Sequence, residues 1–194
     1  MTLLGQILLL LAAIASTLYL FRGTQDNLDS SSEIKVTRLS LLSMIIALIG
    51  SFTLTSDSMD SSTLLRILNN LALYAGAPMM ASALLARAVQ RSFTMQTWGR
   101  YLLALIALFE LCRRMDAGAG YAMVLAIVLI GALGAAAFLS KIRSQRASFL
   151  SAALLLAIAI FSWKANTSDL LLYLALSLTL LFASKGLKAK ASQA

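Results

Sequence analysis

Long, uninterrupted apolar segments constrain this chain more than any other feature of its sequence. Each is close to the roughly 20 residues that a helix needs to cross the hydrocarbon core of a bilayer. The chain is 60% hydrophobic and only 12% charged, whereas about a quarter of the residues in a soluble domain are charged. Because the apolar runs lack the alternation of membrane barrel strands, we predict an all-α integral membrane protein.

Seven segments meet or approach the length of a membrane span, and short polar stretches separate them. No stretch rich in proline or glycine divides the chain, so we expect a single transmembrane domain over residues 1-194. The predicted fold class is a polytopic bundle of about seven transmembrane helices, of which the last two are short. These helices cover residues 3-21, 39-55, 64-88, 101-117, 121-140, 148-163 and 169-184.

The positions of lysine and arginine predict the orientation, because cytoplasmic loops of membrane proteins collect basic residues. With the N-terminus outside, twelve of the 16 basic residues, Lys190 among them, fall on the inner side. If residues 101-117 did not cross, the division would be nine to seven. We therefore expect an N-out/C-in, multi-pass protein of the cell membrane, of the bacterial inner-membrane type. The basic residues left outside are Arg66, Arg113, Arg114 and Lys164.

The residue types that the chain lacks exclude several kinds of chemistry. It has no histidine and a single cysteine, Cys112, so histidine-ligated metals, iron–sulfur clusters and Ser-His or Cys-His nucleophiles are ruled out. No glycine-rich phosphate loop is present. We expect no cofactor and no metal site, and we interpret Cys112 as a small packed hydrophobe. The net charge of +8 follows from topology, so we expect no nucleic-acid partner.

The fourth predicted helix carries a cluster of charged residues at helical spacing. Glu110 lies three and four positions before Arg113 and Arg114, and Asp116 follows Arg113 by three. These intervals bring side chains onto neighbouring faces, with the glutamate first, which is the favourable order. Ionisable groups inside a membrane are costly and are mostly functional or paired. The cluster is therefore a candidate site.

The third predicted helix carries a matching polar stripe. Arg66, Asn70, Tyr74 and Pro78 follow one another at steps of four residues, with Asn69 beside Asn70. Pro78 frees the carbonyl of Tyr74 and predicts a kink. If the third and fourth helices are antiparallel neighbours, their polar residues line an outward-opening site that favours phosphate or carboxylate groups. The candidate ligand-binding residues are Arg66, Asn69, Asn70, Tyr74, Glu110, Arg113, Arg114 and Asp116.

Three functions are compatible with these residues. The first is a small transporter-like or lipid- or anion-handling protein that uses the outward-facing site. The second is a non-catalytic membrane subunit or assembly partner, in which Glu110 and the arginines form a structural ion pair. The third, an intramembrane lipid-modifying enzyme, needs Glu110 or Asp116 as acid or base, and no nucleophile–base pair accompanies them. The expected partners are membrane lipids and either another membrane protein or further copies of the chain.

Small residues predict where the helices approach one another. Gly50, Gly76, Gly131 and Gly134 lie within predicted spans, and glycine allows close contact between membrane helices. We interpret these positions as packing sites inside the bundle.

Overall fold

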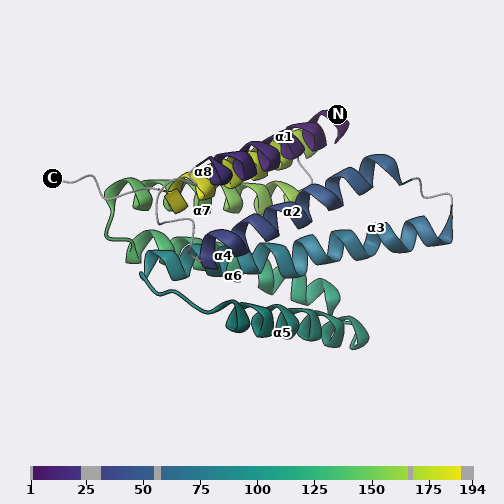
Figure 1. Ribbon diagram of the computed structural model, residues 1–194. Helices are drawn as coiled ribbons and strands as arrows, with labels where there is room; N and C mark the ends of the chain where they lie inside the picture. The colour runs from purple at the N-terminus through teal and green to yellow at the C-terminus, as the bar shows by residue number, and fades with distance from the viewer. Residues whose placement is uncertain (1, 23–31, 55–57, 166–167, 189–194) are drawn as a thin grey trace.

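The computed structural model describes residues 2–22, 32–54, 58–165 and 168–188. Seven continuous helices make up this part of the chain, and none of its residues is in a β-strand. One helix is divided into α3, a π-helical turn η2 and α4 (Figure 1). The elements are α1 (Thr2–Phe21), α2 (Ser32–Thr53), α3 (Met59–Leu71), η2 (Ala72–Gly76), α4 (Ala77–Ala88), α5 (Met95–Arg114), α6 (Gly118–Leu139), α7 (Arg143–Ala165) and α8 (Asp169–Lys188).

Successive helices run in alternating directions, so the bundle has two distinct ends (Figure 1). α8 packs between α1 and α7, and α4 packs against α2 and α6. α5 lies at the edge, where it contacts η2 and α6. The start of α1 and the end of α8 are at opposite ends of the bundle, as an odd number of antiparallel helices requires.

Six of the described helices are long and apolar enough to cross a membrane. They correspond to six of the seven predicted segments, which supports a helical membrane protein. The remaining helix is α5, whose apolar stretch at residues 101–109 is bounded by Arg100 and Glu110. The membrane crossing of α5 therefore stays a prediction.

Several helices are longer than their apolar segments. α2 begins at Ser32, ahead of the predicted start at residue 39, and α7 begins at Arg143, ahead of residue 148. Hydropathy marks only the part of a helix that suits hydrocarbon, whereas backbone hydrogen bonding continues into the polar interface. Lys35 and Arg38 interrupt the apolar run of α2 without ending the helix.

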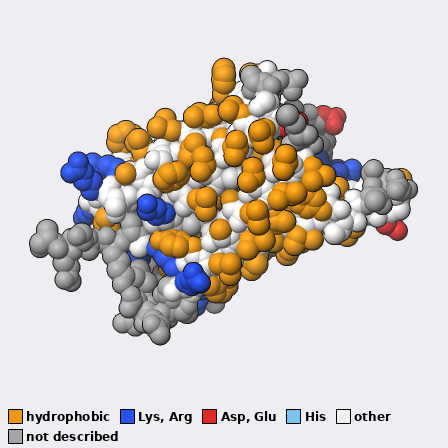
Figure 2. Space-filling view, turned by 90° about the horizontal axis from the view of Figure 1, so that it is seen from above, with side chains coloured by type: hydrophobic (Ala, Val, Ile, Leu, Met, Phe, Trp, Pro, Cys, Tyr) orange, Lys and Arg blue, Asp and Glu red, His pale blue; other side chains and the backbone are white. Residues whose placement is uncertain are grey.

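Hydrophobic side chains cover the outside of the bundle as well as its interior. Leu103, Phe138 and Phe161 are among the large apolar residues that are most exposed. Figure 2 shows such side chains across the whole visible face, with lysine and arginine gathered mainly at one end. An apolar surface of this extent is expected where lipid replaces water as the solvent.

The two ends of the bundle differ in charge. One end, which we call the basic end, holds Arg22, Glu33, Lys35, Arg38, Arg87, Arg91, Arg100, Lys141, Arg143, Arg146, Lys185 and Lys188. The opposite end, the mixed end, holds Arg66, Arg113, Arg114 and Lys164 together with Asp60, Glu110, Asp116 and Asp169. Among the described residues, the basic end therefore has a large positive excess and the mixed end is balanced. Lys190 lies outside the described residues.

Some of the glycines at close helix contacts were predicted from the sequence, and others were not. A Cβ atom added at Gly186 would lie 2.4 Å from the Phe149 ring, and one added at Gly5 would lie 2.4 Å from the Tyr173 ring. Gly50 and Gly76 also face neighbouring helices, as predicted. The prediction was wrong for Gly131 and Gly134, which have open space in front of them. Gly131 is exposed and Gly134 is partly buried.

Candidate functional site

An ion-pair network forms at the last turn of α5. Glu110 receives two hydrogen bonds from Arg113, at 2.8 Å from Nε and 2.7 Å from Nη2, and one from Arg114 Nε at 3.1 Å. The side chains are open to the surroundings, with exposed fractions of 37% for Glu110, 55% for Arg113 and 74% for Arg114. Both arginines also lie where the negative end of the helix dipole favours cations. The network is an exposed intrahelical feature that keeps one net positive charge.

Asp116 has a backbone role at the end of α5. Its φ of 54° is in the left-handed region, and the backbone N–H groups of Asp116 and Ala117 donate to the carbonyls of Arg113 and Cys112. This pair of bonds is a Schellman motif, which ends a helix by reversing the chain. The carboxylate of Asp116 makes no hydrogen bond or ion pair with a described residue.

Tyr74 joins three elements through an aromatic cluster. Its ring stacks on Phe109 of α5 with centroids 4.2 Å apart and lies 5.6 Å from Tyr121 of α6. Tyr74 lies in the π-helical turn η2, which ends two residues before Pro78. The N–H of Ala77 donates to the carbonyl of Ala72, five residues earlier, because a π-helix absorbs one extra residue. The kink predicted at Pro78 stays a prediction.

The predicted cluster is divided into separate parts. Arg66 and Asn69 are exposed on α3, and Asn70 is half-buried there. None of the three forms a hydrogen bond or ion pair with Glu110, Arg113 or Arg114 in the described part of the chain. Tyr74 is the only residue of the third-helix stripe that contacts α5 through an aromatic ring. Asn69 instead lines a cavity on another side of its helix.

That cavity, here called the central cavity, has a volume of about 420 Å³. Its walls come from α1, α2, α3, η2, α4, α6, α7 and α8. They are apolar except for Asn69 and Thr179, and the Thr179 hydroxyl already donates to the Ala175 carbonyl at 2.8 Å. Asn69 therefore supplies the free polar group of the wall. Leu73, also in the wall, is 52% exposed, so the wall reaches the outside of the bundle at η2.

The central cavity is elongated. Its lining extends along α3, η2 and α4 from Asn69 to Leu84, which is about 22 Å at the helical rise of about 1.5 Å per residue. Because the wall is apolar over this length, the space suits an extended hydrocarbon chain.

The cavity was not predicted from the sequence, although one signal for it exists. Five of its 18 lining residues are alanines, and they come from several helices: Ala47, Ala72, Ala77, Ala81 and Ala183. Alanines that face each other leave space when the helices are held apart by larger residues elsewhere. A single sequence does not reveal which alanines face each other, so the cavity could not be predicted from it.

Metal binding receives no support within the described residues, where no group of three or more potential ligands occurs among cysteine, aspartate and glutamate. Comparison with known protein families, curated proteins and solved structures finds no match to this chain. The functional argument therefore depends on the central cavity and on the charged and aromatic residues at the two ends of the bundle.

Proposed function

We propose that this protein is a lipid-handling membrane protein that binds a single anionic amphiphile, with its hydrocarbon chain in the central cavity and its headgroup at Asn69 and Arg66. The single observation that carries the proposal is an elongated apolar cavity whose one free polar group is Asn69. Binding sites for small molecules have this composition, with apolar walls and few polar groups.

The opening of the cavity favours an occupant from the bilayer. Its wall reaches the outside of the bundle at Leu73, which is 52% exposed. A hydrocarbon chain from the surrounding lipid can therefore lie against the apolar wall without any change in the fold.

Arg66 and Asn69 suit an anionic headgroup. They are three residues apart, so they occupy neighbouring positions on one face of α3, with Arg66 closer to the mixed end. Neither makes a hydrogen bond or ion pair with a described residue. A guanidinium group binds phosphate in a fork geometry. A phosphate at this level would place the attached chain at the Asn69 end of the cavity.

The proposed orientation places the basic end in the cytoplasm and the mixed end outside. It includes a crossing by α5, which lies alongside the other helices and keeps the alternation of directions. The amphiphile would then enter from the outer leaflet. Glu110, Arg113 and Arg114 lie at the same end and add to the polar surroundings of the headgroup.

Lipid rebinding by purified protein tests this proposal. Protein stripped of lipid in detergent is mixed with phosphatidylglycerol or phosphatidylcholine, and bound lipid is counted by native mass spectrometry. We expect one tightly bound phosphatidylglycerol. Ala47→Phe, which fills the cavity wall, should abolish this binding, and Arg66→Gln should remove the preference for the anionic lipid.

The matched control is Ala15→Phe, an exposed position of α1 outside the cavity wall, which should bind lipid like the unaltered protein. Undiminished binding by Ala47→Phe would overturn the cavity as the site. If Ala47→Phe fails to fold, Leu73→Glu takes its place, because Leu73 lines the cavity and is 52% exposed. Equal binding of the two lipids by the unaltered protein would overturn the anionic headgroup.

A further inference from the structure

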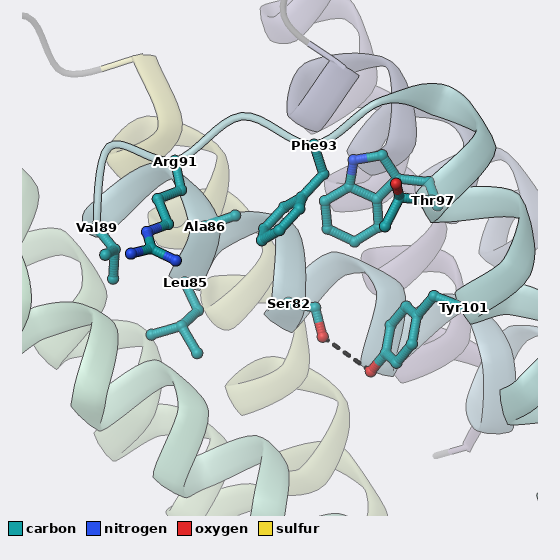
Figure 3. A pocket seen from close by; sticks show the side chains of 9 residues that line it. Ser82, Leu85, Ala86, Val89, Arg91, Phe93, Thr97 and Tyr101 are labelled. Carbon is teal, nitrogen blue, oxygen red and sulfur yellow. Dashed lines mark hydrogen bonds between the residues drawn. The ribbon is translucent and has the colours of Figure 1, made fainter.

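A second pocket of about 420 Å³ lies at the basic end, between the end of α4, the connection that follows it and the start of α5. Figure 3 shows Arg91 extending over the pocket near Val89 and Leu85, with Phe93, Thr97 and Tyr101 on the other side. Ser82 lies between these two sides and is hydrogen-bonded to Tyr101, with 2.9 Å between the hydroxyl oxygens. We call this space the inner pocket.

The charge of the inner pocket is entirely positive. Arg91 supplies its only ionised side chain, and no aspartate or glutamate lines it. The guanidinium group of Arg91 has no hydrogen bond or ion pair with any described residue. The pocket also belongs to the end of the bundle that carries the positive excess. The carboxylate of Glu33 lies behind the lining, where it is buried and bonded to the backbone of Phe93. An anion would therefore find a cation at the rim of an apolar space.

Trp98 forms part of the apolar wall of the inner pocket. The residue lines the pocket and is only 5% exposed, and its indole nitrogen is buried inside the protein. The ring therefore presents carbon, not its N–H group, to the pocket. Phe93 and Tyr101 lie edge-on to the indole, with centroids 5.8 Å and 6.2 Å away. Aromatic residues of this kind are typical of the boundary between headgroups and hydrocarbon.

The pocket is held in place from two directions. Glu33, only 2% exposed, accepts a hydrogen bond of 3.1 Å from the backbone N–H of Phe93. The hydroxyl of Ser32 donates to the carbonyl of Phe93, so α2 binds both backbone groups of that residue. Arg91 is positioned by a second Schellman motif, in which its N–H donates to the Ala86 carbonyl at 3.0 Å. A preformed pocket loses little entropy when a ligand binds.

We propose that the inner pocket binds an anionic phospholipid of the leaflet at the basic end. Its phosphate pairs with Arg91, and one acyl chain lies along Leu85 and Val89 against the ring of Trp98. An apolar wall beneath a single cation fits an amphiphile and does not fit a wholly soluble anion. This site is separate from the central cavity and lies at the other end of the bundle.

Fluorescence of Trp98 tests the proposal directly. The chain has two tryptophans, so Trp163→Phe leaves Trp98 as the single reporter. This protein is placed in lipid nanodiscs that contain equal fractions of phosphatidylglycerol and phosphatidylcholine, with bromine on the chains of one lipid or of the other. We expect stronger quenching by brominated phosphatidylglycerol. Arg91→Gln should lower the preference about fivefold, which corresponds to about 1 kcal/mol per basic residue at an anionic surface.

Arg143→Gln is the matched control, because Arg143 is an exposed arginine of the same end that does not line the pocket. Its quenching should equal that of the unaltered reporter protein. A second variant, Val89→Glu, places a carboxylate at the exposed rim and should also remove the preference. Arg66→Gln should have no effect on Trp98, which separates this test from that of the central cavity.

Three results would overturn the proposal. One is equal quenching by the two brominated lipids in the reporter protein. Another is equal behaviour of Arg91→Gln and Arg143→Gln. The third is a fluorescence change with inorganic phosphate, in nanodiscs of phosphatidylcholine alone, as large as that with phosphatidylglycerol, because the pocket would then bind soluble anions.

Discussion

At the scale of single residues, two described residues other than glycine have a left-handed backbone conformation. Gln90 and Asp116 have φ values of 58° and 54°, and each follows the last turn of a helix in a Schellman motif. Glycine is the usual residue there, because a Cβ atom makes the left-handed conformation unfavourable. The chain therefore accepts a local cost at both ends of α5: just before it at Gln90 and just after it at Asp116.

This observation predicts that Gln90→Gly stabilises the protein. Glycine adopts the left-handed conformation without the Cβ penalty, so we expect a gain of up to about 1 kcal/mol, or about 2–4 °C in Tm. Thermal unfolding in detergent, followed by circular dichroism, measures it. Ala104→Gly, in the middle of α5, should instead destabilise the protein by about 1 kcal/mol. Equal shifts for the two variants would contradict the argument.

Residue-scale predictions from the sequence were possible where the interactions are local. The spacing of Glu110, Arg113 and Arg114 is sufficient to place these charges within reach of one another on a helix, and the structure pairs them. The sequence could not reveal that Asn69 lines a cavity while Tyr74 stacks on Phe109. Those surroundings depend on which helices pack against each side of α3.

At the scale of helices, α8 packs closely against two neighbours. It packs between α1 and α7, and Gly186 lies against the fully buried ring of Phe149 on α7. Thr179 and Ser184 turn their hydroxyls back to carbonyls of the same helix. This leaves the faces of α8 free of unpaired hydroxyls and allows close packing of small residues.

We therefore predict that Gly186→Ala destabilises the bundle. The added Cβ would lie 2.4 Å from a ring carbon of Phe149, and overpacking of a core typically costs about 1–3 kcal/mol. Gly131→Ala is the matched control, because nothing lies within 4 Å of the Cβ added there. The control should be neutral or slightly stabilising. A Gly186→Ala protein that unfolds at the same temperature as the control would show that α7 can move aside.

Helix positions could be predicted from hydropathy, but their limits could not. The six apolar helices correspond to predicted segments, because the bilayer core demands long apolar runs. Hydropathy does not register the polar turns that extend α2 back to Ser32 and α7 back to Arg143. Nor does it show which glycines face a partner helix, as Gly131 and Gly134 demonstrate.

At the scale of the whole molecule, charge separates the two ends of the bundle. The basic residues of the basic end come from the helices before and after each connection at that end. The separation of charge therefore depends on the alternating directions of the helices. If α5 crosses the membrane, the chain has seven crossings and the basic end faces the cytoplasm. If it does not, the helices after α5 would have the reverse orientation relative to those before it.

Cysteine labelling distinguishes these arrangements. In a Cys112→Ser background, single cysteines replace Asp60, Ser92 and Asp116, all of which are exposed. A membrane-impermeant thiol reagent should label the cysteines at 60 and 116 from outside, and the one at 92 only after the membrane is opened. Labelling of positions 92 and 116 from the same side would show that α5 does not cross. Labelling of position 60 only from the cytoplasm would reverse the proposed orientation.

The short apolar stretch of α5 has a consequence for how the chain would enter a membrane. The stretch is shorter than that of any neighbouring helix, and the half of α5 nearer the mixed end is held through Phe109 between Tyr74 and Tyr121. A segment of this kind is poorly recognised by the insertion machinery when presented alone. If α5 crosses the membrane, the machinery would have to retain it until α6 emerges, so that the two helices enter as a hairpin.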